Sequence, residues 1–394
     1  MNVLLPALFF FTLLLLCPLF RPSPCAGEVF PTGDKGPIMQ RPNPALTACS
    51  ESDNTWHFGV RASAFLGNRM LPLHEMFSDT WEGEVHIDDR NLIHSKALAE
   101  AFAGRSGWEL SFGVREQMST RANRDTAEAF ALLKGKKDLP TGKIYHAELE
   151  GDGFVAEELR IAVGRTAGAA SGFSFGGALG LLHGERIQKG DLTGTLQATG
   201  PRSYNYALAL DYAYDMSYLY DSPVSRAGMD GYGYAIDLGA IWRKDRFVVS
   251  LYGEDLFSTI YWSDVPMTTA VASNGRVSFD SQGYARYDPI ISGFEGKRQV
   301  TQRLPPRLSA EAGYVTDTFM TSVTLDRMDG FYFPRLSAAV RSGERAGWWS
   351  VAVDLFFRTV GVGYEGETVG FHLFADHLLP EKVKALGLRL QLRR

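Results

Sequence analysis

Histidine, aspartate and serine side chains are the first candidates for chemistry in this chain. His372 and His377 lie close to Asp376, a grouping that could bind a metal ion. A β-strand, however, would place positions 372 and 377 on opposite faces, because successive side chains alternate. Ser309 and Ser350 could act as nucleophiles only with a histidine and an acid in defined geometry, which the spacing does not provide. The sequence therefore predicts no catalytic residues, no metal site and no cofactor.

Charged side chains alternate with apolar ones in many short segments after residue 55. In such a period-two pattern the charged residues share one face of a strand. We expect this face to line the interior of a barrel, where water or a partner of opposite charge must offset the cost of burying a charge. These residues could line a solute pathway or form an ion-pair network that closes the barrel. They are Arg61, Glu109, Arg115, Asp211, Asp215, Asp237, Glu254, Glu311, Asp354, Arg389 and Gln391.

The segment from Tyr204 to Tyr220 shows the alternation most clearly, with tyrosines near both ends and leucines between them. At a rise of about 3.3 Å per residue and a tilt of roughly 40°, Tyr206 and Tyr214 would lie about 20 Å apart along the membrane normal. This is close to the separation of the two aromatic girdles of an outer-membrane barrel. The predicted lipid-interface aromatics are Trp56, Tyr204, Tyr206, Tyr212, Tyr214, Tyr218, Tyr220, Trp242 and Trp349.

The composition and the N-terminal region bound the class of protein. The chain has 394 residues, of which 45% are hydrophobic, and a formal net charge of -5, which excludes a disordered chain and a strongly basic nucleic-acid-binding protein. Residues 1–26 resemble a signal peptide cut near Ala26, with an uncleaved anchor helix as the alternative. Residues 27–54 contain several prolines and no periodicity, and are expected to form a periplasmic extension. Within it, Cys49 is interpreted as a lone thiol.

Residues 55–394 are predicted to form an all-β, transmembrane antiparallel barrel of about 14 strands, with about 16 possible if the segments around 107–150 join the wall. Short helical insertions at 91–103 and 123–134, the second with Asp125 as its N-cap, are expected in or under the lumen. Connections at 243–246, 316–318, 342–347 and 366–368 are short, and are expected on the periplasmic side. Connections at 221–230, 263–306 and 377–384 are longer and are expected outside, together with a short one at 357–359.

Three segments between Gly107 and Arg165 carry a resemblance to a known family. SFGVREQ, NRDTAEAFALLKG and EELRIAVGR follow one another as strand, helix and strand. In this order the chain resembles the opening of FadL-like outer-membrane barrels of the TraF/PorV-type uncharacterised group. The resemblance implies an outer-membrane barrel with a helix associated with its lumen. Two features differ from that pattern, since no long N-terminal hatch is recognised and the last residues, Leu392-Arg393-Arg394, are not aromatic.

Two hypotheses of function follow. The first is a porin-like or FadL-like channel of the outer membrane for a small, hydrophobic or amphipathic solute. The second is a non-conducting barrel that acts as a scaffold or assembly partner in the envelope. In both, the signal peptide is removed, the expected partners are outer-membrane lipid and the barrel-assembly machinery, and no nucleic acid is involved. A lumen free of helices favours the first hypothesis, and helices packed across the bore favour the second.

Overall fold

The computed structural model describes residues 42–46, 56–76, 78, 81–105, 107–167, 172–217, 224–274, 277–279, 285–287, 291–342 and 347–394. The predicted signal peptide, most of the predicted extension over 27–54, and Tyr218 and Tyr220 lie outside these ranges. Within the ranges, regular structure is almost entirely β-strand, as the period-two patterns predict.

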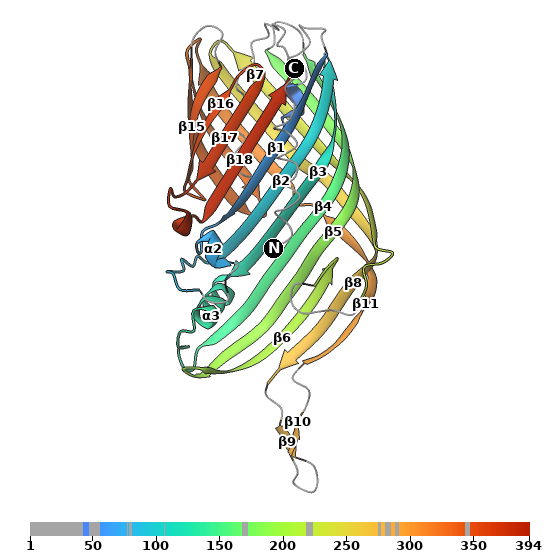
Figure 1. The fold of residues 1–394 in the computed structure, drawn as a ribbon, viewed down its shortest axis with the longest axis vertical. Helices are drawn as coiled ribbons and strands as arrows, with labels where there is room; N and C mark the ends of the chain where they lie inside the picture. The colour runs from blue at the N-terminus through green and yellow to red at the C-terminus, as the bar shows by residue number, and fades with distance from the viewer. Residues whose placement is uncertain are drawn as a thin grey trace.

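Fourteen antiparallel strands close into a barrel, and two extra strands lengthen part of its wall (Figure 1). The barrel closes where the last strand pairs with the first, with Arg61 opposite Gln391. This confirms the expected all-β barrel of about 14 strands. The barrel strands are β1 (His57–Asn68), β2 (Arg90–Arg105), β3 (Trp108–Asn123), β4 (Ile144–Thr166), β5 (Phe173–Gly200), β7 (Asp230–Lys244), β8 (Phe247–Ser273), β12 (Arg307–Val315), β13 (Phe319–Met328), β14 (Phe331–Arg341), β15 (Trp348–Asp354), β16 (Thr359–Glu365), β17 (Val369–Ala375) and β18 (Ala385–Arg393).

The two extra strands, β6 (Ser203–Tyr214) and β11 (Ile291–Arg303), continue the columns of β7 and β12. β6 and β7 both lie between β5 and β8, each paired with a different part of these long strands. β11 and β12 share the other edge of β8 in the same way. The long strands β4, β5 and β8 therefore extend past the closed barrel as a one-sided wall, beyond which β9 (Val277–Phe279) and β10 (Ala285–Tyr287) form a small hairpin (Figure 1).

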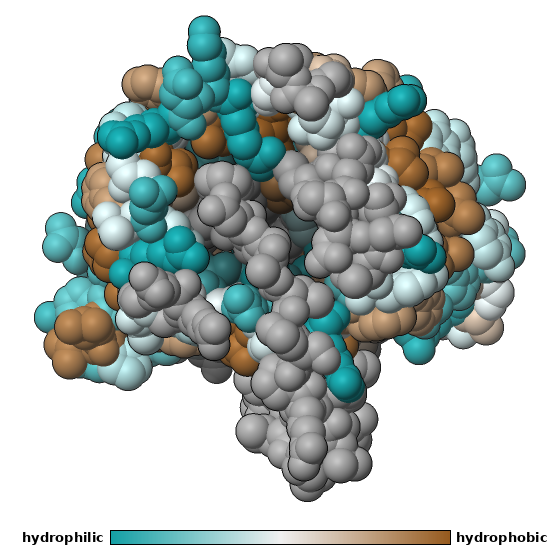
Figure 2. Space-filling view, turned by 90° about the horizontal axis from the view of Figure 1, so that it is seen from above, coloured by the Kyte–Doolittle hydropathy of each residue, from teal (hydrophilic) through white to brown (hydrophobic). Residues whose placement is uncertain are grey.

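The outer face of the barrel carries a band of apolar side chains. Leu110 of β3 lies opposite Ile161 of β4, and Phe112 lies opposite Leu159, and all four are exposed. Because side chains alternate along each strand, the residues between them point inward, and these include many charged groups. Seen from the end with the C-terminus, hydrophobic residues lie on the outer rim and hydrophilic ones surround the mouth (Figure 2).

The connections predicted on the periplasmic side all fall at one end of the barrel, whereas the opposite end has long connections and also short ones at 201–202, 329–330 and 355–358. The connections at 243–246, 316–318 and 366–368, together with the paired residues Ser342 and Gly347, lie at the end where β1 begins and β18 ends. The opposite end carries α2 (Leu73–Met76), α3 (Arg124–Lys134) and the turn η2 (Pro380–Lys382). The predicted outer loop over 263–306 is wrong in part, because β8 continues to Ser273 and β11 occupies 291–303.

The predicted helix over residues 91–103 is wrong, because these residues form most of β2. Leu92, Leu98 and Phe102 are buried inside the barrel, and Lys96 and Glu100 are buried on the same face. The outer face of this strand is largely alanine, a residue that favours helices. The inner face mixes apolar and charged residues, so the two faces do not differ clearly in hydrophobicity. The helical spacing of three apolar residues was therefore coincidental.

The second predicted helix, over 123–134, forms α3 at the end of the barrel opposite the C-terminus and not across the bore (Figure 1). Its N-cap is Asn123 and not Asp125, since the Asn123 side chain accepts a hydrogen bond from the Thr126 amide at 2.9 Å. Phe130 and Leu133 of this helix are exposed. None of the described helices is long and apolar enough to cross a membrane.

Candidate functional site: the interior of the barrel

A bulge in β8 brings two carboxylates into the centre of the bore. Ile236 pairs with Phe257 and Leu238 pairs with Gly253, so residues 254–256 lie opposite Asp237 alone. Asp255 adopts a positive φ of 59° there, and its amide donates a hydrogen bond of 2.9 Å to the Asp237 carboxylate. The bulge thus directs Glu254 and Asp255 inward, and both are 1% exposed.

Three cations meet these carboxylates and close the bore at this level, two from the opposite wall and one from the neighbouring strand β12. Arg115 of β3 donates two hydrogen bonds to Asp255, at 2.9 and 2.6 Å, and Lys96 of β2 lies 2.9 Å from Glu254. Arg307 of β12 lies 3.2 Å from Glu254 and 3.4 Å from Asp255. All five side chains are buried. Burying charges is tolerable only because each has a partner of opposite sign, so these residues form one ion-pair layer.

Two further ion-pair groups lie closer to the end with the C-terminus. Arg61 lies 2.9 Å from Glu100 and 2.6 Å from Glu109, and its guanidinium stacks on the ring of Phe102. Separately, Arg160 donates hydrogen bonds of 3.1 and 2.9 Å to Asp237. Asp237 is therefore a junction, because it also accepts the amide hydrogen bond that fixes the β8 bulge.

An apolar layer lies on the other side of the ion pairs, toward the extended wall. Its members are Phe154, Ala156, Leu182, Ile187, Ala213, Ala235, Ile260, Trp262, Val265, Met267, Val300 and Leu304. The indole of Trp262 covers Gly184 and Gly231, where an added Cβ would lie 2.4 and 2.5 Å from ring atoms. Its Nε1 donates to Gln302, which in turn donates to Asp152 on β4 at 2.6 Å. Three strand columns, those of β5, β6 and β8, lie between β4 and β11, so this contact crosses the bore.

The other half of the bore is closed at the same end by phenylalanines. Phe65, Phe331, Phe333 and Phe357 pack together with Leu92, Met328 and Ala385. Arg90 stacks on Phe331 and donates to the Asp329 carbonyl, and Arg121 lies 2.6 Å from the Asp329 carboxylate. The end of the described bore opposite the C-terminus is therefore apolar, with charged groups beneath and beside it.

Residues 42–46, here called the strap, lie inside the mouth at the end with the C-terminus. The Asn43 amide donates hydrogen bonds of 3.1 Å to the Ser250 hydroxyl and to the Leu251 carbonyl. Gly239 and Gly176 make room for it, since a Cβ on Gly239 would lie 1.7 Å from the Asn43 amide oxygen, and one on Gly176 would lie 2.5 Å from the Pro44 carbonyl. A cavity of about 110 Å³ remains between the strap and His57, Glu109, Arg160 and Ala162.

Most of the charged residues predicted to face inward do so, but in ion pairs and not in open space. Arg61, Glu109, Arg115, Asp237 and Glu254 belong to the groups above. Asp354 is 3% exposed and accepts the Phe357 amide, and Glu311, Arg389 and Gln391 lie on inward positions of β12 and β18. Asp211 is half-exposed and pairs with Arg298 at the level of the extended wall.

Asp215 corrects one of these predictions. It follows β6 and accepts hydrogen bonds of 2.9 Å from Arg186 and Gln188. Arg186 pairs with Val155, which shares the outer face of β4 with Leu159 and Ile161. Asp215 therefore lies on the outer side of the wall. At Val155 and Ala156 of β4, the paired strand β5 contains one extra residue, which exchanges the inward and outward positions of β5 beyond that point. The sequence of β6 gives no indication of this change.

The aromatic residues divide between the outer band and the extended wall. Trp56, Trp242 and Trp349 are exposed on the outer face near the end with the C-terminus, where Trp349 packs on Tyr364 and Phe371. At the other edge of the band, exposed aromatic residues are Tyr232, Tyr234, Phe257, Tyr261 and Tyr332. These five residues were not predicted, although Tyr232 and Tyr234 alternate with small residues at the start of β7.

The proposed girdle within the segment from Tyr204 to Tyr220 is wrong. β6 ends at Tyr214, and it is one of the two extra strands, so Tyr204, Tyr206 and Tyr212 lie in the wall beyond the closed barrel. Tyr214 is only 1% exposed and its hydroxyl lies 3.2 Å from that of Thr268. The alternation identifies a strand with two faces, but not its height along the barrel.

Several interior residues were not predicted. Lys96 and Glu100 were assigned to a helix, and Asp255 and Arg307 lie beside a bulge that interrupts the alternation. Glu158 and Arg160 could have been found, because they alternate with Leu159 and Ile161 in a clear period-two pattern. Asn43 carries no sequence signal, since it lies between two prolines in a segment without periodicity.

No family model matches this chain, and no curated protein matches it in sequence. Among solved structures it is similar to the toluene transporter TodX of P. putida, with 10% identity and a TM-score of 0.44 over 89% of this chain and 90% of that one. A TodX deletion mutant, named a monoaromatic hydrocarbon channel, gives 10% identity and 0.45 over 89% and 92%. The translocator domain of the autotransporter NalP from Neisseria meningitidis gives 8% identity and 0.31 over 88% and 91%. The likeness, including that to the FadL-family TodX, is one of barrel architecture alone.

Proposed function

We propose that this protein is an outer-membrane barrel that admits a small apolar or amphipathic solute, and that its described structure is a closed state. The membrane assignment is supported by the exposed apolar band with aromatic residues at both edges. On β7, Tyr232 and Trp242 are ten residues apart, which corresponds to about 25 Å along the normal at a tilt of about 40°. This matches the height of the apolar band of outer-membrane barrels.

The apolar layer around Trp262 is the feature that indicates which class of solute enters the barrel. A solute that enters from the side of the extended wall passes the half-exposed pair of Asp211 and Arg298. It then meets Trp262, Ile260, Val265 and Met267 before it reaches the buried ion-pair layer. A bore for hydrophilic solutes would instead be lined by polar groups and water from its mouth. The order of the layers along β8, apolar and then charged, therefore favours an apolar or amphipathic solute.

Passage requires two further changes. The ion pairs of Arg115, Lys96 and Arg307 must separate at least in part, and the strap must leave Ser250 and Leu251. Because separation of a buried pair leaves uncompensated charge, the closed barrel is expected to conduct ions poorly. This property distinguishes the proposal from a general porin.

A non-conducting barrel with a role in envelope assembly is the second candidate. The observation that favours it is the same ion-pair layer, which joins β2 and β3 to β8 and β12 across the bore. A lumen free of helices was expected for a channel, and a bore filled by helices for a scaffold. No described helix crosses the bore, yet side chains fill it at the level of the ion pairs, so this criterion does not decide between the two. The strap and its two glycines favour the channel, since a permanent plug needs no separate segment inside the mouth.

Uptake of an apolar probe by intact cells tests the proposal, because the lipopolysaccharide leaflet is a barrier to such solutes. Cells with the protein are expected to take up N-phenyl-1-naphthylamine faster than cells without it, and a hydrophilic sugar of similar size no faster. Replacement of Trp262 by Glu should remove the gain, whereas Tyr261→Ala, on the outer face of the same strand, should retain it. Equal uptake with and without the protein, once folded barrel is verified in the envelope of the cells that express it, would favour the assembly role.

A further inference from the structure

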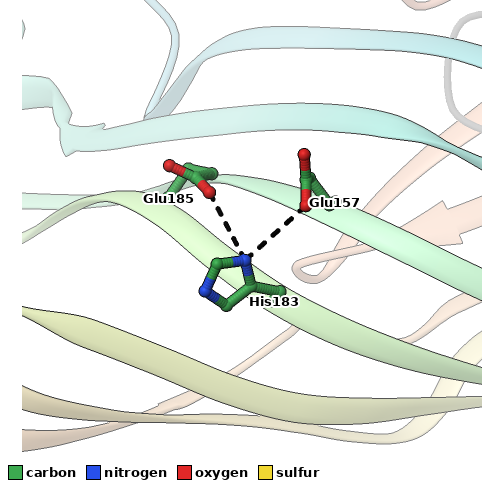
Figure 3. Close-up of side chains that lie close together, drawn as sticks. All are labelled: Glu157, His183 and Glu185. Carbon is green, nitrogen blue, oxygen red and sulfur yellow. Dashed lines mark ion pairs between the residues drawn. The ribbon is translucent and has the colours of Figure 1, made fainter.

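A group of metal-ligating side chains lies on the outer face of the barrel, away from the bore. Glu157 of β4 lies directly opposite His183 of β5 in the strand register, so both point to the same face. Glu185 follows two residues after His183 at the β5 bulge and shares that face (Figure 3). Asp230 begins the neighbouring strand β7, where Tyr232 lies opposite His183 and packs on its ring at 5.2 Å.

The two nitrogens of His183 face different partners. Nδ1 lies 3.6 Å from Glu157 Oε2 and 3.4 Å from Glu185 Oε1, while Nε2 lies 3.3 Å from Asp230 Oδ1. With a cation between Nδ1 and the two glutamates, the Nδ1 lone pair would bind that cation, and the Asp230 carboxylate would accept the proton held on Nε2. This is the arrangement in which an outer carboxylate orients a histidine that binds a metal.

The distances fit a shared cation better than direct ion pairs. A charge-assisted hydrogen bond between a ring nitrogen and a carboxylate is about 2.7–2.9 Å long, well below the 3.4 and 3.6 Å seen here. Ligands on a tetrahedral zinc ion, bound at about 2.1 Å, lie about 3.4 Å from one another. The three ligand atoms of Glu157, His183 and Glu185 all lie within 4.8 Å of each other.

The charge of the group also favours a cation. Three carboxylates surround one imidazole, and among the described residues the ion pairs recorded for these carboxylates are with His183 alone. The side chains are 42–49% exposed, so a hydrated ion can reach them and water can complete its coordination. A histidine nitrogen among the ligands selects Zn²⁺ over Ca²⁺ and Mg²⁺, which prefer oxygen ligands alone.

We propose that Glu157, His183 and Glu185 bind one Zn²⁺ ion on the outer face, with Asp230 as the residue that orients His183. The site lies at the edge of the apolar band, one alternation beyond Leu159 and Leu181, and therefore beside the outer aqueous phase. A bound ion would join β4 and β5 at the bulge where their register shifts. The site is independent of the bore and of any solute.

Calorimetric titration of the metal-stripped, folded barrel in detergent with ZnCl₂ tests the proposal. Wild type is expected to show one site that a large excess of Ca²⁺ does not displace. His183→Ala should lower the affinity at least 10-fold, and Asp230→Asn should lower it by roughly 10- to 100-fold, as for other residues that orient a ligand. His86→Ala is the matched control, because His86 is also an exposed histidine 3.3 Å from an aspartate, and it should leave the affinity unchanged.

Thermal unfolding followed by circular dichroism accompanies each titration and establishes that every variant is folded. Zn²⁺ should raise the unfolding temperature of wild type and of His86→Ala, but not that of His183→Ala. Equal Zn²⁺ affinity of folded wild type and folded His183→Ala would overturn the proposal. So would complete displacement by Ca²⁺, since that result would indicate only a cluster of carboxylates.

Discussion

The guanidinium of Arg115 on β3 forms two hydrogen bonds with the carboxylate of Asp255 on β8, across the bore of the barrel. Both side chains are at most 2% exposed, and Asp255 reaches this position only because a bulge in β8 turns it inward. The pair couples a local irregularity of one strand to closure of the whole barrel. Its partners Glu254, Lys96 and Arg307 extend the same layer.

Loss of one member of this pair should destabilise the barrel strongly. Arg115→Met leaves Asp255 and Glu158 with less compensation in a buried environment, and we expect the free energy of unfolding to fall by about 3–5 kcal/mol. The double variant Arg115→Met, Asp255→Leu removes both charges and should regain part of this loss. Urea unfolding of the refolded barrel in detergent measures both values.

The exposed pair of Arg202 and Asp138 supplies the control for this prediction. Arg202→Met should change the free energy of unfolding by less than about 1 kcal/mol, because solvent screens an exposed ion pair. A similar loss in Arg115→Met and Arg202→Met would show that the buried layer is not a determinant of barrel stability.

Gly239→Ala should displace the strap, because the added Cβ would overlap the Asn43 side chain. We expect residues 42–46 to become accessible to protease and the free energy of unfolding to fall by about 1–3 kcal/mol, as for other overpacked sites. Gly177→Ala is the matched control, since a Cβ there meets its nearest atom at 3.4 Å. Proteolysis followed by mass spectrometry gives the result, and equal cleavage of both variants would argue against the seating of the strap.

Trp262→Ala should empty the centre of the apolar layer. Trp262 is 2% exposed and covers two glycines that have no side chain to fill the space. Removal of the indole should lower the free energy of unfolding by about 3–5 kcal/mol. Tyr261→Ala, at an outer position of the same strand, should cost clearly less. Equal losses would indicate that the layer is loosely packed.

Asp191 should make the stability of the extended wall depend on pH. It lies opposite Glu150 on β4 and Asp211 on β6, beyond the apolar band. Burial raises the pKa of Asp191, and the nearby carboxylates of Glu150 and Asp211 raise it further, against the opposing effect of Lys189. The folded state thus holds this proton more tightly than the unfolded state does, so ionised Asp191 is unfavourable above its folded pKa.

Asp191→Asn should therefore stabilise the barrel at pH 7. The advantage should shrink as the pH falls through the raised pKa and vanish below the ordinary value of 3.8, where Asp191 is protonated in both states. Urea unfolding of both proteins at a series of pH values measures this difference. An advantage that persists unchanged at about pH 3 would mean that charge is not its cause.

Much of the barrel could be predicted because lipid-facing and interior residues alternate along most strands. The strand number and the short connections follow from this alternation and from turn residues. β2 was mistaken for a helix because its interior face mixes Leu98 with Lys96 and Glu100, while its outer face is largely alanine. Hydrophobicity does not distinguish the two faces of such a strand.

The site was harder to predict than the fold, because it depends on irregularities. The β8 bulge decides that Asp255 points inward, and the β5 bulge decides that Asp215 points outward. The residue types of these strands give no indication of either bulge. Asn43 is held in the bore by a hydrogen bond to Ser250, which is 207 residues away in the sequence. A contact between residues so far apart cannot be predicted from local patterns.

The central claim is that the strap closes a solute pathway, and a reversible cross-link tests it most directly. Cysteines in place of Asn43 and Ser250, with Cys49 replaced by Ser, would tie the strap to β8 when oxidised. Uptake of N-phenyl-1-naphthylamine by intact cells should then be low under oxidising conditions and return after reduction, with no change in the protein without cysteines. Equal uptake in the oxidised and reduced states, with the cross-link verified by mass spectrometry, would contradict the account.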